Sequence, residues 1–228
     1  MAVLLLRICG VMQSWGTDSR FLIRGTDLEP SKSGVVGLLC SALGRGRNKD
    51  VSDLSRLRMG VRVDFPGAVR KEYQTAIGER GLIRLASGGK REAAVISDRY
   101  YLNEADFLIG LEGPQSLLEE LDKALQNPRW HLFLGRKAHV PSVPVWIPDG
   151  LREGSLESVL ESYPWPGVHT DVPKTSPKSL KTVIEVEEGE EIRTDQPLSF
   201  DDRRFGSRSI ETAFLGLGND VPIRDGGE

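Results

Sequence analysis

Cysteine and histidine are scarce in this sequence, which has two cysteines and three histidines among 228 residues. Cys9 and Cys40 lack the close spacing of a metal site, and two lone cysteines are typical of proteins in a reducing cytoplasm. The sequence also has no GxxxxGK[ST] phosphate loop, no GxSxG elbow and no HExxH zinc motif. We therefore expect a cytoplasmic protein without a metal ion or another cofactor.

Long apolar stretches are missing as well. No run approaches the roughly 20 residues that span a membrane. The apolar start, MAVLLLRICG, is interrupted too early by Arg7 to act as a signal peptide. The 39% hydrophobic and 28% charged residues are typical of a globular protein. A chain of this length can bury a core as one large domain or two small ones, and we expect no membrane partner.

The net charge of −3 conceals an asymmetry along the chain. Residues 1–140 carry 21 Lys and Arg against 16 Asp and Glu, whereas residues 141–228 carry 9 against 17. The first part is therefore basic by 5 charges and the second acidic by 8. We expect any polyanion to bind the first part, and the acidic remainder to face solvent or a protein partner.

The stretch Pro30–Arg47, PSKSGVVGLLCSALGRGR, predicts an amphipathic helix with charged ends. Ser31 or Ser33 can cap the first free amides, which together with the helix dipole and Lys32 form an anion site. Gly44 can end the helix in the left-handed conformation, ahead of a loop that carries Arg45 and Arg47. The apolar face, predicted to pack on a sheet, consists of Val35, Val36, Leu39, Ala42 and Leu43. An ordinary core helix with charged ends is the alternative.

The other segments predict an α+β fold. Strands are expected at Ala2–Ile8, Arg58–Phe65, Tyr101–Leu111 and Trp130–Leu134, and a second helix at Pro114–Leu125. This order is that of a ferredoxin-like or RRM-type domain over residues 1–140. Val69–Arg99 is too polar to form a core and is predicted to project as a long hairpin or loop. Residues 141–228 are expected to form a loop-rich lobe in which strands Lys181–Glu188 and Ser207–Ala213 pair, with a frayed end at Asn219–Glu228.

Several side chains suggest contacts with a single-stranded nucleic acid. The cations that lie at the ends of predicted elements are Lys32, Arg45, Arg47, Arg136 and Lys137, where phosphates are commonly bound. Met12, Gln13 and Trp15 lie in the glycine-flanked loop GVMQSWG, where the indole can stack on a base or close the edge of the core. Arg58, Arg62 and Asp64 share one strand face, which can bind nucleic acid or face solvent.

A hydrolytic activity is the alternative to simple binding. A metal-independent ribonuclease needs a general base and a cation, and Tyr73 or His139 with Lys137 can supply these groups. The same residues can instead serve in packing or lie on the surface.

Several motifs, taken in order, resemble the fifth-numbered family of CRISPR-associated (Cas) proteins in its type I-E form. They are GVMQSWG, PSKSGVVGLLCSALGRGR, RMGVRVDFPG, RYYLNEADFLIGLEG, NPRWHLFLGRKAHVPSVPVWI and DQPLSFDDRRFGSRSI, and they extend from about residue 3 to about residue 212. The resemblance implies a RAMP-type fold with a ferredoxin-like palm (1–140), a protruding thumb inserted at about 69–99, and a small β-rich C-terminal lobe (141–228). After the basic pair this chain has Ala138-His139 where such relatives often have Ser-Cys.

The resemblance also implies a non-catalytic subunit of the Cascade complex, which surveys DNA in antiviral defence. Such subunits bind the 5′ handle of the CRISPR RNA, cap the filament of backbone subunits and help to seat the large subunit, so that the contact with target DNA is indirect. Carried over by position, the RNA-binding residues are Met12, Gln13, Trp15, Ser31, Lys32, Ser33, Arg45, Arg47, Phe133, Leu134, Arg136 and Lys137. The thumb would also touch the adjacent backbone subunit. Type I-C relatives that cut precursor RNA with a Tyr, Lys and His set provide the enzymatic alternative.

Overall fold

The computed structural model describes residues 2–17, 22–78, 82–84, 88–92, 94–166 and 179–216. These residues form one nine-stranded, mostly antiparallel sheet, a separate two-stranded hairpin and four helices. The α+β class is therefore confirmed. The predicted frayed end at Asn219–Glu228 lies outside the described residues.

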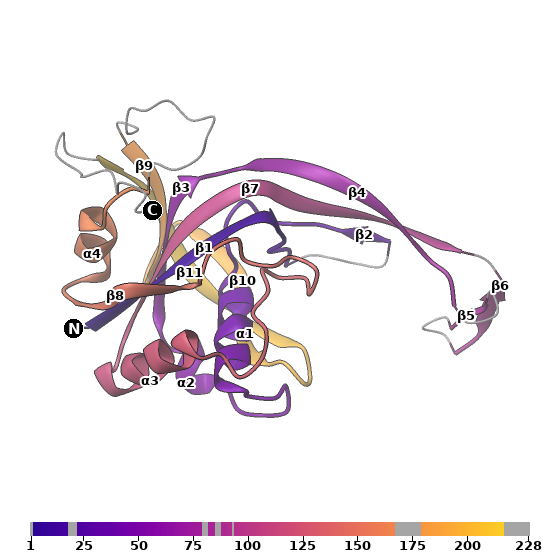
Figure 1. Cartoon of the computed structure of the whole chain (residues 1–228), viewed down its shortest axis with the longest axis horizontal. Coiled ribbons are helices and arrows are strands. Elements are labelled where there is room, and N and C mark those ends of the chain that lie inside the picture. Colours follow the sequence, from indigo (N-terminus) through magenta and orange to yellow (C-terminus); the bar gives the residue numbers. More distant parts are fainter. Residues whose placement is uncertain are drawn as a thin grey trace.

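The elements are shown in Figure 1. The strands are β1 (Ala2–Gln13), β2 (Ile23–Arg24), β3 (Arg58–Phe65), β4 (Ala68–Ala76), β5 (Leu82–Arg84), β6 (Lys90–Glu92), β7 (Val95–Gly113), β8 (Trp146–Glu153), β9 (Ser179–Val186), β10 (Glu191–Ser199) and β11 (Arg204–Gly216). The helices are α1 (Lys32–Leu43), α2 (Ser52–Ser55), α3 (Gln115–Gln126) and α4 (Leu156–Ser162).

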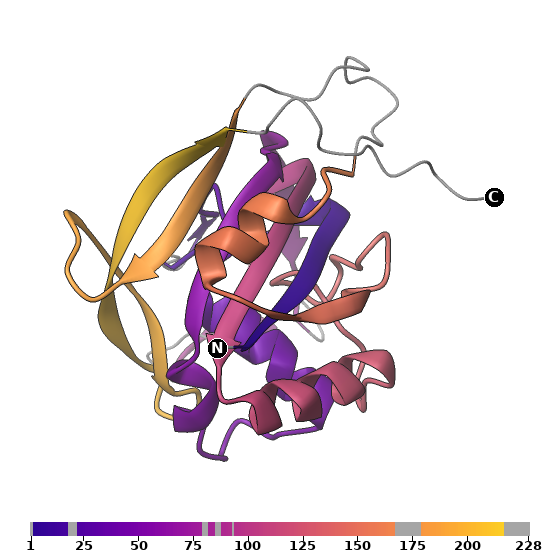
Figure 2. The same cartoon turned by 90° about the vertical axis from the view of Figure 1, so that its left-hand side faces the viewer.

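Strands β1 and β7 are central because they carry alternating apolar side chains to two covered faces. The strand order is β10-β11-β9-β3-β7-β1-β8, with β2 and β4 paired to β7 outside this path. Leu4 and Leu6 of β1 point into the core beneath α1 and α3, whereas Val3 and Leu5 point into a second core beneath α4. Figure 2 shows α4 lying across the sheet, and α1 and α3 at the lower end of the sheet. A two-residue period with both faces apolar is the pattern of a strand buried on both sides.

Helix α1 begins and ends as its sequence predicts. The Ser31 hydroxyl accepts the Gly34 N–H at 3.3 Å, and Gly44 follows the last turn with a φ of +70°. The Gly44 and Arg45 N–H groups close the end by donating to carbonyls of the last turn.

The prediction of a strand at Trp130–Leu134 is wrong. Within this segment the Trp130 N–H donates to the Ser41 carbonyl at 3.1 Å, and the preceding Arg129 N–H donates to Ala42 at 2.9 Å. These bonds satisfy free carbonyls at the end of α1, so the segment covers a helix end instead of joining a sheet. The strand beside β1 is β8, which pairs with it from Ala2 to Leu6 through a bulge.

Strands β4 and β7 continue beyond the core as a long two-stranded arm (Figure 1). Antiparallel pairing runs without a break from Ala68 opposite Asn103 to Ala76 opposite Val95, so the predicted projecting hairpin is confirmed. The chain bends where the arm leaves the core, at Gly67 with a φ of +65° and Glu104 with a φ of +56°. A Cβ at Gly67 would lie 2.5 Å from the Asn103 carbonyl oxygen, so this bend requires glycine.

The last three strands extend the same sheet. Strand β9 pairs with β3 on one side and with β11 on the other, which confirms the pairing predicted for Lys181–Glu188 and Ser207–Ala213. No helix of the described ranges combines the length and the apolar character required to cross a bilayer.

Candidate nucleic-acid interface

The segments GVMQSWG and FLGRK, far apart in sequence, lie against each other at the base of the arm. The first of them is predicted as a loop, but its residues 10–13 continue strand β1 and only residues 14–16 leave the sheet. The Ser14 N–H donates to the Leu134 carbonyl at 3.1 Å, and a Cβ at Gly10 would lie 2.7 Å from the Leu134 side chain. Gly135 has a φ of +88°, and a Cβ there would overlap the Ser14 carbonyl oxygen. The two motifs can approach this closely only because glycine stands at both contact points.

Arg136 joins this loop to the base of the arm. Its Nη2 donates to the carbonyls of Tyr100 at 2.9 Å and Arg24 at 3.1 Å, and its Nη1 lies 3.7 Å from the Glu72 carboxylate. Burial lowers the pKa of the guanidinium, Glu72 opposes this, and the nearby Arg99 and Arg24 lower the pKa further. A site that concentrates positive charge in this way attracts an anion.

We define the arm-base cluster as Arg24, Arg99, Arg136 and Lys137. Strand β2 pairs with β7 so that Arg24 lies opposite Arg99. Arg136 donates to the Arg24 carbonyl and lies close enough to both arginines for their charges to lower its pKa. Lys137 is exposed beside Arg136. The first two arginines were not among the predicted site residues, since the sequence alone does not reveal the pairing of a two-residue strand.

The aromatic part of the predicted site is buried. Trp15 is 1% exposed, and its indole N–H donates to the Gln13 side-chain oxygen at 3.1 Å. The Gln13 side-chain amide in turn donates to the Ala105 carbonyl at 2.6 Å. Trp15 therefore has no ring face available for a base, and the alternative, that it closes the edge of the core, is confirmed. Met12 remains partly exposed.

The N-terminus of α1 does bind an anion, but the anion belongs to the same chain. The Lys32 N–H donates to the Asp195 carboxylate at 2.7 Å, while the Lys32 ammonium donates to both oxygens of Glu185 at 2.7 and 2.8 Å. Lys32 is 1% exposed, and burial lowers its pKa even though Glu185 raises it. Lys32 and the capping Ser31 are thus turned inward, and Ser33 is half-buried beside them.

At the other end of α1, the two predicted arginines differ. Arg45 forms a two-pronged ion pair with Asp53, with N–O distances of 2.5 and 2.9 Å. This hydrogen-bonded pairing raises the pKa of Arg45, so the side chain is held in place within the loop. Arg47 is exposed, and the Arg129 side chain lies over Gly44 close by.

The remaining predicted pocket residues form a layered loop. Leu134 is buried, Phe133 is half-buried and Lys137 is exposed. The loop closes on itself because the Leu134 N–H donates to the His139 carbonyl at 2.7 Å and the His139 N–H to the Arg136 carbonyl at 2.8 Å. The apolar Leu134 thus forms the buried side of the loop, and the charged Lys137 lies on its exposed side.

For Arg62 and Asp64, two of the three residues predicted to share a strand face with Arg58, both hypotheses are wrong. Arg62 is fully buried, with its guanidinium on Asp64 at 2.7 Å and on the carbonyls of Leu160 and Tyr163, both at 2.6 Å. Helix α4 covers this face, so the arginine binds the end of that helix instead of nucleic acid or water. Arg58 is partly exposed and paired with acidic residues.

The residues of the hydrolytic alternative differ in their exposure. His139 is 2% exposed, with its ring 6.2 Å from that of Tyr101, and burial lowers its pKa. Tyr73 is 63% exposed on the arm, and no hydrogen bond or ion pair within the described ranges joins it to His139 or Lys137. Among the residues that the structure describes, no group of three His, Cys, Asp or Glu side chains is placed to hold a metal ion.

Comparison with known proteins places these features in one family. The sequence profile of the family described as CRISPR-associated protein (Cas_Cas5) matches residues 3–211. The CRISPR system Cascade subunit CasD of Escherichia coli (strain K12) is 31% identical over 161 residues, which cover 63% of this chain and 69% of CasD. A solved structure described as the crystal structure of a Cas protein is 44% identical, with a TM-score of 0.75 over 94% of this chain and 95% of its own. A chain of a CRISPR RNA-guided surveillance complex is 28% identical, with a TM-score of 0.78 over 96% of this chain and 92% of its own. The chain belongs to the CRISPR-associated Cas5 family.

Proposed function

We propose that this protein is a non-catalytic subunit of a type I-E Cascade complex and binds the 5′ handle of the CRISPR RNA. The observation that carries the proposal is the arm-base cluster, in which the FLGRK loop is held against GVMQSWG beside two further arginines. Cations fixed by surrounding backbone bind phosphates with little loss of side-chain entropy. The similarity to CasD and to a chain of an RNA-guided surveillance complex supports this assignment.

The twelve predicted RNA-binding residues divide by exposure. Those with accessible side chains, proposed as direct contacts, are Met12, Ser33, Arg47, Phe133, Arg136 and Lys137. Gln13, Trp15, Ser31, Lys32 and Leu134 are buried and are proposed to shape the interface from behind, and Arg45 to position its loop. Arg24 and Arg99 extend the proposed site toward the arm.

The larger parts of the molecule are assigned by the same proposal. Strands β8-β1-β7-β3 with α1 and α3 are proposed as the ferredoxin-like palm, and the arm as the thumb that reaches over RNA and touches a backbone subunit. The C-terminal lobe is proposed to start after about residue 140 and to have strands β9–β11 as its core. Strand β8 falls within this range of the sequence but belongs to the palm. In this role the protein caps the backbone filament, helps to seat the large subunit for DNA surveillance, and works in the cytoplasm.

The binding proposal is tested with the double substitution Arg136→Ala/Lys137→Ala. Loss of the fixed Arg136 and the exposed Lys137 is expected to weaken binding of handle RNA at least tenfold, because charge-assisted hydrogen bonds are the strong ones. The slope of log affinity against log salt should become shallower by about 1.4, that is about 0.7 per lost phosphate contact. Filter binding at several salt concentrations measures both. The control is Lys123→Ala/Arg152→Ala, which removes two exposed cations elsewhere. Equal binding by the two double variants would refute the site.

The non-catalytic part of the proposal is tested with precursor CRISPR RNA in EDTA. We expect the RNA to remain intact, because the imidazole of His139 is buried and therefore not accessible to the RNA. Cleavage at one position that disappears in His139→Ala would instead establish the endoribonuclease.

A further inference from the structure

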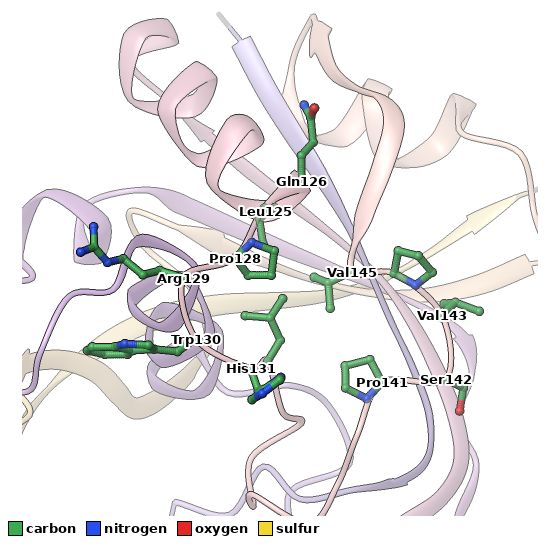
Figure 3. Close-up of a pocket in the computed structure, with 12 residues that line it drawn as sticks. Leu125, Gln126, Pro128, Arg129, Trp130, His131, Pro141, Ser142, Val143 and Val145 are labelled. Atoms are coloured by element: carbon green, nitrogen blue, oxygen red, sulfur yellow. The ribbon is translucent and has the colours of Figure 1, made fainter.

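Apolar side chains line two features of the surface, a hollow and the arm. The hollow, about 640 Å³ in volume, lies between the two stems of the loop that joins α3 to β8 (Figure 3). Its stems contain Pro128, Pro141 and Pro144, and neither stem is a strand, so they offer a partner no regular row of backbone hydrogen bonds. The arm, in contrast, combines exposed apolar side chains with a long strand edge.

Strand β4 is this edge. Its nine residues pair with β7 without a bulge, and within the described parts of the chain no strand pairs with its other side. The strand contains no proline, and Figure 1 shows it along the upper edge of the arm, away from the helices. A long, regular edge strand readily pairs with a strand of another chain, because its outward N–H and C=O groups form a row of donors and acceptors.

The two faces of the arm differ in chemistry. Residues directly opposite each other in a sheet share a face, so Glu72 and Arg99 lie on the face of the arm-base cluster. Tyr73 lies on the other face, where its side chain is 63% exposed. Val69 and Ile96 share this second face and are also exposed. An edge strand with an apolar face can gain stability from backbone pairing and from side-chain burial together.

We propose that the β4 strands of two copies of this chain pair antiparallel about a two-fold axis at Tyr73, so that the free chain forms a dimer. An axis at this residue brings Tyr73 opposite its own copy and Val69 opposite Ile77, which is exposed just past the end of β4. Aromatic and β-branched residues that face each other across two strands stabilise the pairing.

The charges of β4 favour the same register. With the axis at Tyr73, Lys71 lies opposite Thr75 and Glu72 lies opposite Gln74, so no charged side chain faces a like charge. An axis at Lys71 would oppose two lysines, and one at Glu72 would oppose two carboxylates, which destabilises either pairing. A strand of another subunit also fits an open edge, but β4 already complements itself in both its apolar and its charged residues.

The dimer is expected to be weak and reversible. One pair of strands buries less than the roughly 1,200 Å² of a stable interface, so the dissociation constant should lie in the micromolar range. The arm that it occupies is the one proposed to reach over RNA and to touch a backbone subunit. Assembly into the complex is therefore expected to separate the two copies. The inference does not depend on RNA binding.

The register is tested at Thr75, which the axis places opposite Lys71. Thr75→Glu adds two attractive pairs to the dimer and should tighten it about fivefold, whereas Thr75→Lys adds two repulsive pairs and should weaken it by a similar factor. Sedimentation equilibrium of the full chain without RNA, over a series of concentrations, measures both. Tyr73→Lys puts two lysines at the axis and should abolish the dimer. Its control is Ile23→Lys, since Ile23 shares the face of Tyr73 but lies on the far side of β7.

Three outcomes would overturn the inference. The first is a chain that stays monomeric at every concentration. The second is a dimer to which the two Thr75 variants do the same, because the strands would then pair in another way. The third is a monomeric chain whose Thr75→Lys variant no longer assembles with the other Cascade subunits, because β4 would then pair with one of those. Handle RNA binding by the Thr75 variants should stay normal, so a failed dimer leaves the proposed function intact.

Discussion

At the scale of single residues, burial separates cations that looked alike in the sequence. Lys32 and Lys137 both lie at the end of a predicted element, and both were expected to contact phosphates. In the structure Lys32 is 1% exposed and paired with Glu185, whereas Lys137 is exposed. A buried lysine that already pairs with a carboxylate is costly to remove, and its ammonium is not accessible to a ligand.

We expect Lys32→Ala to lower the free energy of unfolding by about 3 kcal/mol, because it leaves the Glu185 carboxylate without its main partner. Denaturation in urea measures this change, and Lys49→Ala, at an exposed position, is the control. The double variant Lys32→Met/Glu185→Gln should recover part of the loss. RNA binding by any folded Lys32→Ala protein should be nearly unchanged, so a large loss of binding would restore Lys32 as a direct contact.

His139 gives the stability of the protein a dependence on pH. Burial lowers the pKa of its imidazole in the folded chain, while the unfolded chain has the ordinary value near 6.5. Below about pH 6.5 the unfolded state therefore binds a proton that the folded state does not, and stability falls as the pH falls. Unfolding measured between pH 7.5 and pH 5 should show this loss, reduced in His139→Gln and retained in His131→Gln. Identical profiles in all three proteins would contradict the assignment.

At the scale of elements, two facing glycines determine how closely α4 lies on the sheet. Gly60 of β3 pairs with Gly110 of β7, and Leu156 and Leu160 of α4 rest over them. A Cβ at Gly110 would lie 2.6 Å from Leu156 Cδ1, and one at Gly60 would lie 2.7 Å from Leu160 Cδ1. The missing side chains thus make room for the helix whose last carbonyls bind Arg62.

Gly110→Ala is expected to reduce the free energy of unfolding by about 1–3 kcal/mol, since the leucines of α4 must shift to admit the methyl group. Thermal or urea unfolding provides the measurement. Gly25→Ala, where no atom lies within 4 Å of the added Cβ, should differ from the parent by less than about 0.5 kcal/mol. Equal effects of the two substitutions would show that α4 is not seated on these glycines.

The ends of a helix are easier to predict from the sequence than the distant segments that contact it. The serine cap and glycine end of α1 follow from local chemistry, so the sequence predicts them correctly. The pattern around Trp130 also suits a strand, but the free carbonyls of α1 take its N–H groups. Likewise, nothing near Arg62 reveals that α4, about one hundred residues later, will bury it. Contacts between distant segments decided each case that local patterns missed.

At the scale of the whole molecule, ion pairs join the N-terminal and C-terminal parts of the sheet. Arg208 of β11 donates to Asp195 of β10 at 2.6 Å, and Asp195 also accepts the Lys32 N–H of α1. Burial raises the pKa of Asp195, but the hydrogen bonds and charge of Arg208 together with the Lys32 N–H outweigh it, so the pKa is lowered. The helix that begins beside the proposed RNA site is therefore fastened to the last strands. The opposite charges of the two halves of the sequence, visible from composition, meet in part at this junction.

Strand β7 belongs to both the arm and the centre of the sheet, because its 19 residues continue from one into the other. At about 3.3 Å per residue its length along the chain is roughly 60 Å, measured through the bend at Glu104. A partner that pulls on the arm along this axis loads the hydrogen bonds to β1 and β3 in shear, many at once, instead of peeling them apart singly. Amide hydrogen exchange should therefore slow progressively along one strand, from Ile96 in the arm to Phe107 in the core. Uniform exchange along β7 would mean that the arm and the core do not share this mechanical element.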